Sequence, residues 1–184
     1  MRVVVKSKRI PKKLEEEVKK VIKRYFPEID GVLLYYTGSA YGKYLRDWKI
    51  ALNPIILKKP KRILYHTVAH EVTHLIQWQQ EKVRSKALKT EYSFLYTQRI
   101  PKGEKACEIW TYARHPDLVA PSYYLSVELK KLPNSKKFLS AGIEFYEERS
   151  FEIHRLAKKA IKLRERGVRN YIKWFLNELN SIFG

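Results

Sequence analysis

Two histidines four positions apart, with a glutamate next to the first, constrain this chain more than any other feature: His70-Glu71-Val72-Thr73-His74. On an α-helix, residues i and i+4 lie on one face about one turn apart, so both imidazoles can point at a single cation. Apolar residues recur at helical spacing on another face of the same segment: Leu64, Val68, Val72, Leu75 and Ile76. The pattern predicts a helix over about 62–86, buried on one side and carrying a metal site on the other.

This HExxH pattern is found on helices of zinc hydrolases. Zinc binds neutral imidazole, and a catalytic zinc site uses three protein ligands and leaves one position to water. We therefore expect His70 and His74 to be zinc ligands and Glu71 to be the general base. His66 extends the row, but it lies about 9 Å along the helix axis from the midpoint of the pair. We expect His66 to be a poor ligand.

The third ligand has to come from another part of the chain. Pro101 and Gly103 predict the start of a new helix, and Glu104 and Glu108 lie at i and i+4 on it. One of these carboxylates can bind zinc while the other accepts the N–H of a ligand histidine. Glu91 is a further option that lies closer in sequence.

Together these segments resemble the gluzincin metallopeptidases, in which HExxH is followed on a later helix by a glutamate ligand with an acidic residue four positions on. The resemblance is to small, minigluzincin-like members, and it includes a strand-then-helix lead-in to the motif. It implies a zinc metallopeptidase that hydrolyses peptide bonds of a peptide or protein substrate. The site residues that it implies are the Zn²⁺ ligands His70, His74 and Glu104, the general base Glu71 and the orienting residue Glu108.

The chain departs from the gluzincin pattern at two points. The segment from His74 to Glu104 is longer than in the compact members, and Gly103 stands where asparagine often precedes the glutamate. Glu108 therefore stays open as the third ligand. Metzincins need a glycine and a third histidine soon after the motif, whereas residues 75–80 are Leu-Ile-Gln-Trp-Gln-Gln. That class is excluded.

Peptide hydrolysis also needs a donor for the tetrahedral oxyanion near the metal. The candidates are Tyr96, Tyr112, His115 and Tyr123. The sequence does not choose among them.

The single cysteine, Cys107, rules out an intramolecular disulfide and suits a reducing compartment. It lies three residues after Glu104 and could be a soft metal ligand or a blocking thiol. We expect a small buried core residue instead. Without a membrane-length apolar run or a secretory signal at the start, the sequence favours a cytoplasmic location.

The formal net charge of +19, from 38 basic and 19 acidic residues, attracts polyanions and makes any association salt-dependent. Nucleic acid or an acidic protein partner fits this charge, although no defined nucleic-acid module is present. The alternative function is therefore a non-catalytic zincin-fold binding protein that acts through its basic surface. A zymogen, with a segment covering the cleft, is compatible with the same residues.

We expect an α+β, zincin-like fold, in which a small mixed β-sheet packs on the HExxH helix. The expected strands are 3–5, 32–36 and 48–52, with a helix from Pro11 to about Tyr25 and a loop between Gly38 and Gly42. Residues 48–52 alternate in polarity, so we expect them to be the edge strand that binds an extended substrate.

Residues 1–120 are expected to form the zincin-like catalytic core and residues 121–184 a helical C-terminal extension packed on it. The expected helices in this extension are 123–131 and 136–165, followed after Gly167 by a last helix ending near Phe183. Its apolar stripe favours core or dimer packing; the stripe contains Trp174, Phe175, Leu179, Ile182 and Phe183.

Overall fold

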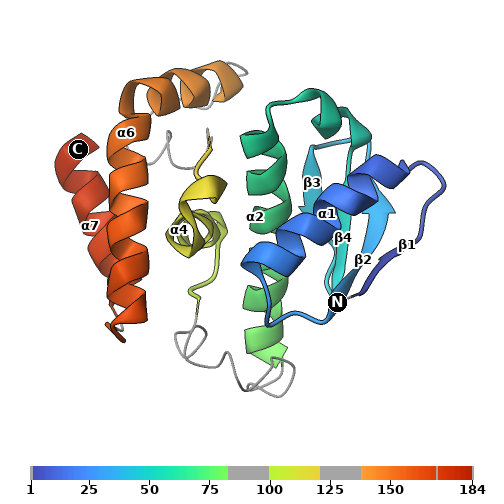
Figure 1. Ribbon diagram of the computed structural model, residues 1–184, viewed down its shortest axis with the longest axis horizontal. Helices are drawn as coiled ribbons and strands as arrows, with labels where there is room; N and C mark the ends of the chain where they lie inside the picture. The colour runs from blue at the N-terminus through green and yellow to red at the C-terminus, as the bar shows by residue number, and fades with distance from the viewer. Residues whose placement is uncertain (1, 83–99, 121–137, 169, 184) are drawn as a thin grey trace. The chain divides into compact units, whose positions relative to one another are not determined.

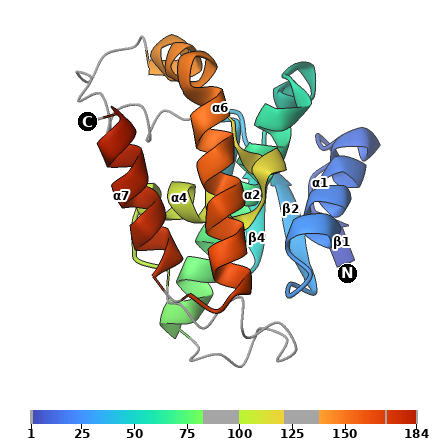
Figure 2. The same cartoon turned by 60° about the vertical axis from the view of Figure 1, so that its left-hand side comes forward.

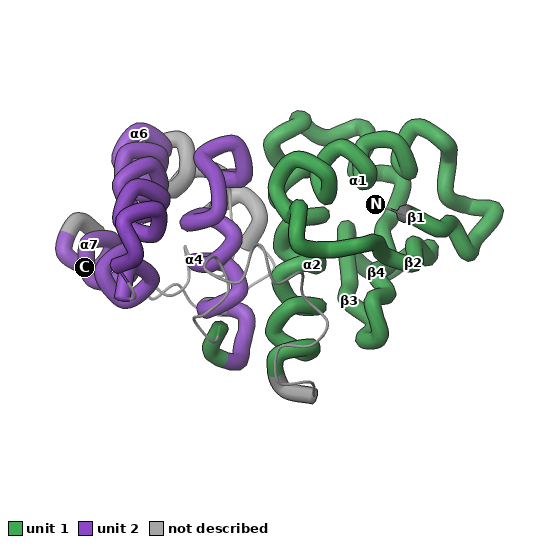
Figure 3. The backbone as a smooth tube through the Cα atoms, turned by 60° about the horizontal axis from the view of Figure 1, so that its bottom comes forward, with its two compact units in different colours: residues 1–101 green, residues 102–184 purple. Residues whose placement is uncertain are grey.

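The computed structural model describes residues 2–82, 100–120, 138–168 and 170–183. These residues form a mixed α+β structure with five helices and one four-stranded mixed sheet. Two compact units make up the chain, residues 1–101 and residues 102–184 (Figure 3). Residues 102–120, which we expected to complete a core spanning 1–120, thus belong to the unit that contains the C-terminal helices.

The first unit is built on the sheet, whose strand order is β1-β2-β4-β3. β1 (Arg2–Val5) and β4 (Lys49–Leu52) each pair in parallel with β2 (Gly31–Tyr36). β3 (Gly42–Tyr44) pairs antiparallel with β4. The strands predicted near 3–5, 32–36 and 48–52 are confirmed as strands.

The prediction that residues 48–52 form the edge strand is wrong. β4 pairs with β2 on one side and β3 on the other, so it lies inside the sheet. Its last three residues are all buried, whereas the alternation of the sequence had indicated one exposed face. The edge strand on this side of the sheet is β3, which begins at the last residue of the expected loop and was not predicted as a strand. The hairpin that follows β3 closes where the Lys49 N–H donates to the Arg46 carbonyl over 2.8 Å.

Two α-helices complete the first unit, and both are labelled in Figures 1 and 2. α1 (Lys12–Tyr25) contacts β1, and α2 (Lys61–Lys82) contacts both β3 and β4 as well as α1. The apolar face of α1 is buried, and so is the face of α2 that carries Val68, Val72 and Ile76. Both helices were predicted, and the expected end of α2 at 83–86 lies outside the described residues. The HExxH helix therefore packs against the edge strand of the sheet.

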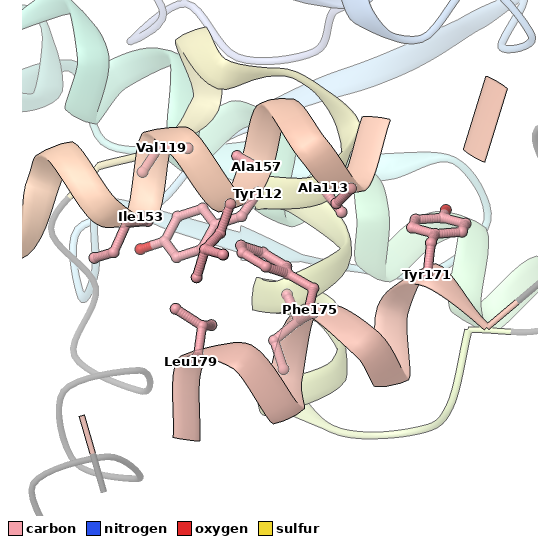
Figure 4. Packing of buried hydrophobic residues seen from close by; sticks show 11 residues of the cluster. Tyr112, Ala113, Val119, Ile153, Ala157, Tyr171, Phe175 and Leu179 are labelled. Carbon is pink, nitrogen blue, oxygen red and sulfur yellow. The ribbon is translucent and has the colours of Figure 1, made fainter. Parts of the chain in front are cut away.

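The second unit is helical and contains α4 (Glu104–Arg114), the 3-10 turn η3 (Pro116–Leu118), α6 (Phe138–Glu165) and α7 (Tyr171–Phe183). Figure 4 shows its apolar core, to which α4 contributes Tyr112, α6 Ile153 and Ala157, and α7 Phe175 and Leu179. Part of the C-terminal apolar stripe is thus confirmed as core. The helix expected at 123–131 lies outside the described residues.

Both glycines expected to mark helix boundaries do so with a positive φ. Gly103, with φ of 102°, is the N-cap of α4. Gly167, with φ of 76°, follows α6, where the Val168 N–H donates to the Leu163 carbonyl and the Gly167 N–H to the Arg164 carbonyl. This pair of bonds is the Schellman motif, which satisfies carbonyls at a helix end and favours glycine at that position.

Candidate metal centre

The two histidines of the motif converge. His70 and His74 lie on consecutive turns of α2, are both buried, and have their Nε2 atoms 3.1 Å apart. Two imidazoles that bind zinc at about 2.05 Å with a tetrahedral angle have their nitrogens about 3.3 Å apart. The observed separation is therefore close to the spacing that a single tetrahedral zinc ion requires.

His74 is held in place by two neighbours. Its Nδ1 lies 2.7 Å from Oε1 of Gln77, one turn further along α2. Its ring also stacks on Tyr44 of β3, with ring centroids 4.8 Å apart and an interplanar angle of 26°. Restraint at Nδ1 and on the ring face leaves little freedom for the imidazole to rotate.

Glu71, the expected general base, is buried beside the edge strand. A Cβ atom added at Gly42 of β3 would lie 2.9 Å from both Cγ and Oε1 of Glu71 and 2.8 Å from Cγ2 of Thr67. Contacts below 3.0 Å force atoms to move, so only glycine allows β3 to approach α2 this closely. The backbone of β3 at Gly42 therefore lies directly beside the Glu71 side chain.

Each unit contributes buried side chains of a type that could hold a metal ion. In the first unit these are His66, His70 and His74 of α2, and in the second unit they are Cys107 and Glu108 of α4. His66, expected to be a poor ligand, is therefore also a candidate, and its ring centroid lies 5.9 Å from that of His70. Glu104 is only half-buried on the first turn of α4, whereas Glu108 is 2% exposed. Glu104 as the third ligand stays a prediction, and Glu91 lies outside the described residues.

The oxyanion candidates are placed differently. The Tyr112 hydroxyl is buried in the core of the second unit and donates to the carbonyl of Ala120. His115 is partly exposed, and its Nδ1 accepts the N–H of Asp117 at the start of η3. Tyr96 and Tyr123 lie outside the described residues. Tyr112 is therefore engaged in holding its own unit together.

Sequence reasoning missed three residues around the motif: Gly42, Tyr44 and Gln77. Of these, only Gln77 carried a usable signal, because a polar residue three positions after a ligand histidine can reach its Nδ1 on a helix. Gly42 and Tyr44 depend on which strand lies against α2, and short-range patterns do not determine that pairing.

No family model, curated protein or solved structure matches this chain. Within the described ranges, no helix is both long enough and apolar enough to cross a lipid bilayer.

Proposed function

We propose that this protein is a zinc metallopeptidase of the gluzincin type with a zincin-like fold. The observation that carries the proposal is the convergence of the two Nε2 atoms, 3.1 Å apart, with a buried glutamate next to the first histidine in the chain. Two histidines that merely occupied the surface of a helix would need neither a short distance between their Nε2 atoms nor a buried glutamate beside them. The sequence resemblance supplies the class of reaction.

In this proposal His70 and His74 hold the metal together with one carboxylate of α4. The bound zinc would supply Lewis acidity, which lowers the pKa of a water and polarises the scissile carbonyl. Glu71 accepts the proton of the attacking water and passes it to the departing amine. The protons balance, because the proton that Glu71 takes from water ends on the amino group of the departing product.

The substrate is a peptide in extended form. β3 is the strand at the edge of the sheet next to α2, and an edge strand presents unpaired backbone groups that can pair with an added strand. Because Gly42 of this strand lies against Glu71, a peptide paired with β3 would pass the base. The substrate strand in this proposal therefore pairs with β3 and not with residues 48–52, which lie inside the sheet.

Hydrolysis of an unstructured protein by wild type and Glu71→Gln tests the mechanism. We expect the variant to keep its zinc and to lose about 10²- to 10⁴-fold in kcat, the usual contribution of a general base. Glu16→Gln, an exposed residue of α1, is the matched control and should retain full activity. Equal activity in wild type and Glu71→Gln would rule out the mechanism, and inactivity of both would favour the binding function.

The identity of the third ligand is tested by zinc affinity of Glu104→Gln and Glu108→Gln. The resemblance assigns the ligand to Glu104, while burial favours Glu108, because a buried carboxylate requires compensation of its charge. The variant of the true ligand should bind zinc at least about tenfold more weakly, and the other variant should change affinity less. If both retain wild-type affinity, the carboxylate of α4 is not a ligand, and Cys107→Ser is the next variant.

A specific observation also favours the second function, polyanion binding. Four exposed basic residues of α6 and Arg166, which directly follows the helix, recur at helical spacing and cover about 16 Å of one face at 1.5 Å per residue. They are Arg155, Lys158, Lys159, Lys162 and Arg166. Such a row can contact successive phosphates of a nucleic acid.

Salt-dependent binding to a labelled DNA duplex tests this function. Replacing Arg155, Lys158 and Lys162 by glutamine should reduce the slope of log K against log salt by about 2 to 3, because each phosphate contact contributes about 0.9. Glutamine at Lys12, Lys13 and Lys23, which are exposed on α1, makes the same change in net charge elsewhere. Equal effects of the two triple variants would show that overall charge, not the α6 face, attracts DNA.

A further inference from the structure

Gln77 connects a metal-ligand candidate to the backbone of a distant segment. Its side chain is buried, with Oε1 2.7 Å from Nδ1 of His74 and Nε2 2.7 Å from the carbonyl oxygen of Pro101. His74 precedes Gln77 by one helical turn, whereas Pro101 is 24 residues further along the chain. The amide thus bridges a local partner and a long-range one.

The donors and acceptors in this chain of contacts can be assigned without ambiguity. A backbone carbonyl can only accept, so the group of Gln77 that faces Pro101 has to be the NH₂ end of the amide. The oxygen of Gln77 then faces Nδ1 of His74, and since an amide oxygen can only accept, Nδ1 has to carry the proton. In the neutral imidazole this leaves Nε2 with its lone pair.

That lone pair points to the site. Nε2 of His74 is the atom that lies 3.1 Å from Nε2 of His70. Metal binding requires an unprotonated ring nitrogen, so the tautomer imposed through Nδ1 is the one that can bind a cation. In the other tautomer, Nε2 would carry a proton into the space where the metal belongs.

We propose that Gln77 is a positioning residue that holds His74 in its metal-binding tautomer, and that the Pro101 carbonyl sets the orientation of Gln77. The inference rests on the metal site of the proposed function but not on peptide hydrolysis. Gln77 acts through His74 and does not itself contact the metal or the substrate. As a neutral amide it orients the imidazole without adding the negative charge that a carboxylate would place there.

A neighbouring contact allows the tautomer to be separated from the anchoring of the segment. The Ile100 N–H donates to Oε1 of Gln80 over 2.9 Å, one turn beyond Gln77 on α2. Gln77 and Gln80 therefore both hydrogen-bond the backbone of residues 100–101, but the hydrogen bond of Gln80 does not involve His74. Gln80 provides the control for effects that arise only from loosening the segment.

The experiment records long-range ¹H–¹⁵N NMR spectra of the histidine rings in zinc-free protein, at a pH where imidazole is neutral, together with zinc affinity. In wild type we expect His74 as the Nδ1–H tautomer. Gln77→Met keeps the volume but has no amide, so His74 should shift toward the Nε2–H tautomer and zinc affinity should fall about 10- to 100-fold. Gln77→Glu keeps an acceptor for Nδ1 and should restore the tautomer, and Gln80→Leu should leave the tautomer unchanged.

Two results would overturn the inference: His74 remaining in the Nδ1–H tautomer in Gln77→Met, or Gln80→Leu shifting the tautomer as much as Gln77→Met does. If Gln77→Met does not fold, the comparison of Gln77→Glu with wild type decides, because loss of the Nδ1–H tautomer despite a retained acceptor also contradicts it. Absence of zinc binding by wild type with the expected tautomer would refute the metal site and leave the role of Gln77 in place.

Discussion

Replacing Gly42 by alanine tests how closely the edge strand approaches the proposed base. The added methyl group would lie 2.8 Å from Cγ2 of Thr67 and 2.9 Å from Cγ and Oε1 of Glu71. Thr67 is β-branched and stiff at χ1, so it cannot easily turn away. Either the strand moves outward or Glu71 is displaced.

The expected cost follows from these contacts. Inserting a methyl group into a packed site costs about 1 to 3 kcal/mol. Alanine is better than glycine within a strand by about 0.5 to 1 kcal/mol, which offsets part of that cost. We expect Gly42→Ala to lower the free energy of unfolding by about 0.5 to 2 kcal/mol. A displacement of Glu71 approaching 1 Å would reduce kcat by up to about 10²-fold.

Urea unfolding and peptide hydrolysis are measured for three variants. Gly38→Ala is the matched control, since its methyl would meet only the end of the Tyr36 side chain, with the hydroxyl oxygen at 3.1 Å. In Gly42→Ala/Thr67→Ser the Cγ2 atom is gone, so part of the stability should return. Activity should stay low, because the contact with Glu71 remains.

The reasoning would be refuted if Gly42→Ala unfolded at the same urea concentration as wild type and hydrolysed peptide at the same rate. Such a result would mean that β3 does not lie against Glu71 as closely as described. Full recovery of activity in the double variant would instead show that the clash acts through Thr67 alone.

Three further predictions concern stability. Burial raises the pKa of Tyr171 to about 12, above its usual value of about 10. Between these two pH values the folded state keeps a proton that the unfolded state has lost, so stability falls by about 2 to 3 kcal/mol as pH rises. In urea unfolding, the stability of Tyr171→Phe should depend less on pH than that of wild type, and an identical pH dependence would contradict the burial. Arg46 is exposed with φ of 65°, so Arg46→Gly should stabilise by about 0.5 to 1 kcal/mol in the same assay; destabilisation would contradict the hairpin conformation. Tyr112→Phe leaves the buried Ala120 carbonyl without its donor and should cost about 1 to 2 kcal/mol without changing kcat, whereas a selective loss of kcat would return Tyr112 to the oxyanion candidates.

Helix positions could be predicted from the sequence because their signals are local. Apolar spacing predicted α1 and α2, and the glycines at 103 and 167 predicted the start of α4 and the end of α6. Each of these signals acts within one or two turns of the residue that carries it. The α+β class follows from them together with the two strands near the start of the chain.

The strand order could not be predicted in the same way. β3 is only three residues long and begins with a glycine, a residue that usually signals a turn. Its assignment as a strand depends on pairing with β4, and its position at the edge depends on β2 occupying the other side of β4. The residue pattern of one short segment does not tell which strand it pairs with.

For the candidate site, the motif placed the two histidines and the glutamate together because their spacing is helical. The contacts that orient them come from elsewhere: Tyr44 from β3, Gly42 beside Glu71, and Pro101 through Gln77. These partners depend on tertiary packing, and a ligand motif alone carries no information about it.

Zinc content tests the central claim most directly. The protein is purified, dialysed against metal-free buffer and analysed for bound metal, in wild type, His74→Ala and His115→Ala, the last being a partly exposed histidine at the end of α4. The account predicts about one zinc per chain in wild type and His115→Ala, and its loss in His74→Ala. Wild-type protein that retains no zinc when supplied with it, or His74→Ala that retains as much as wild type, would contradict the account.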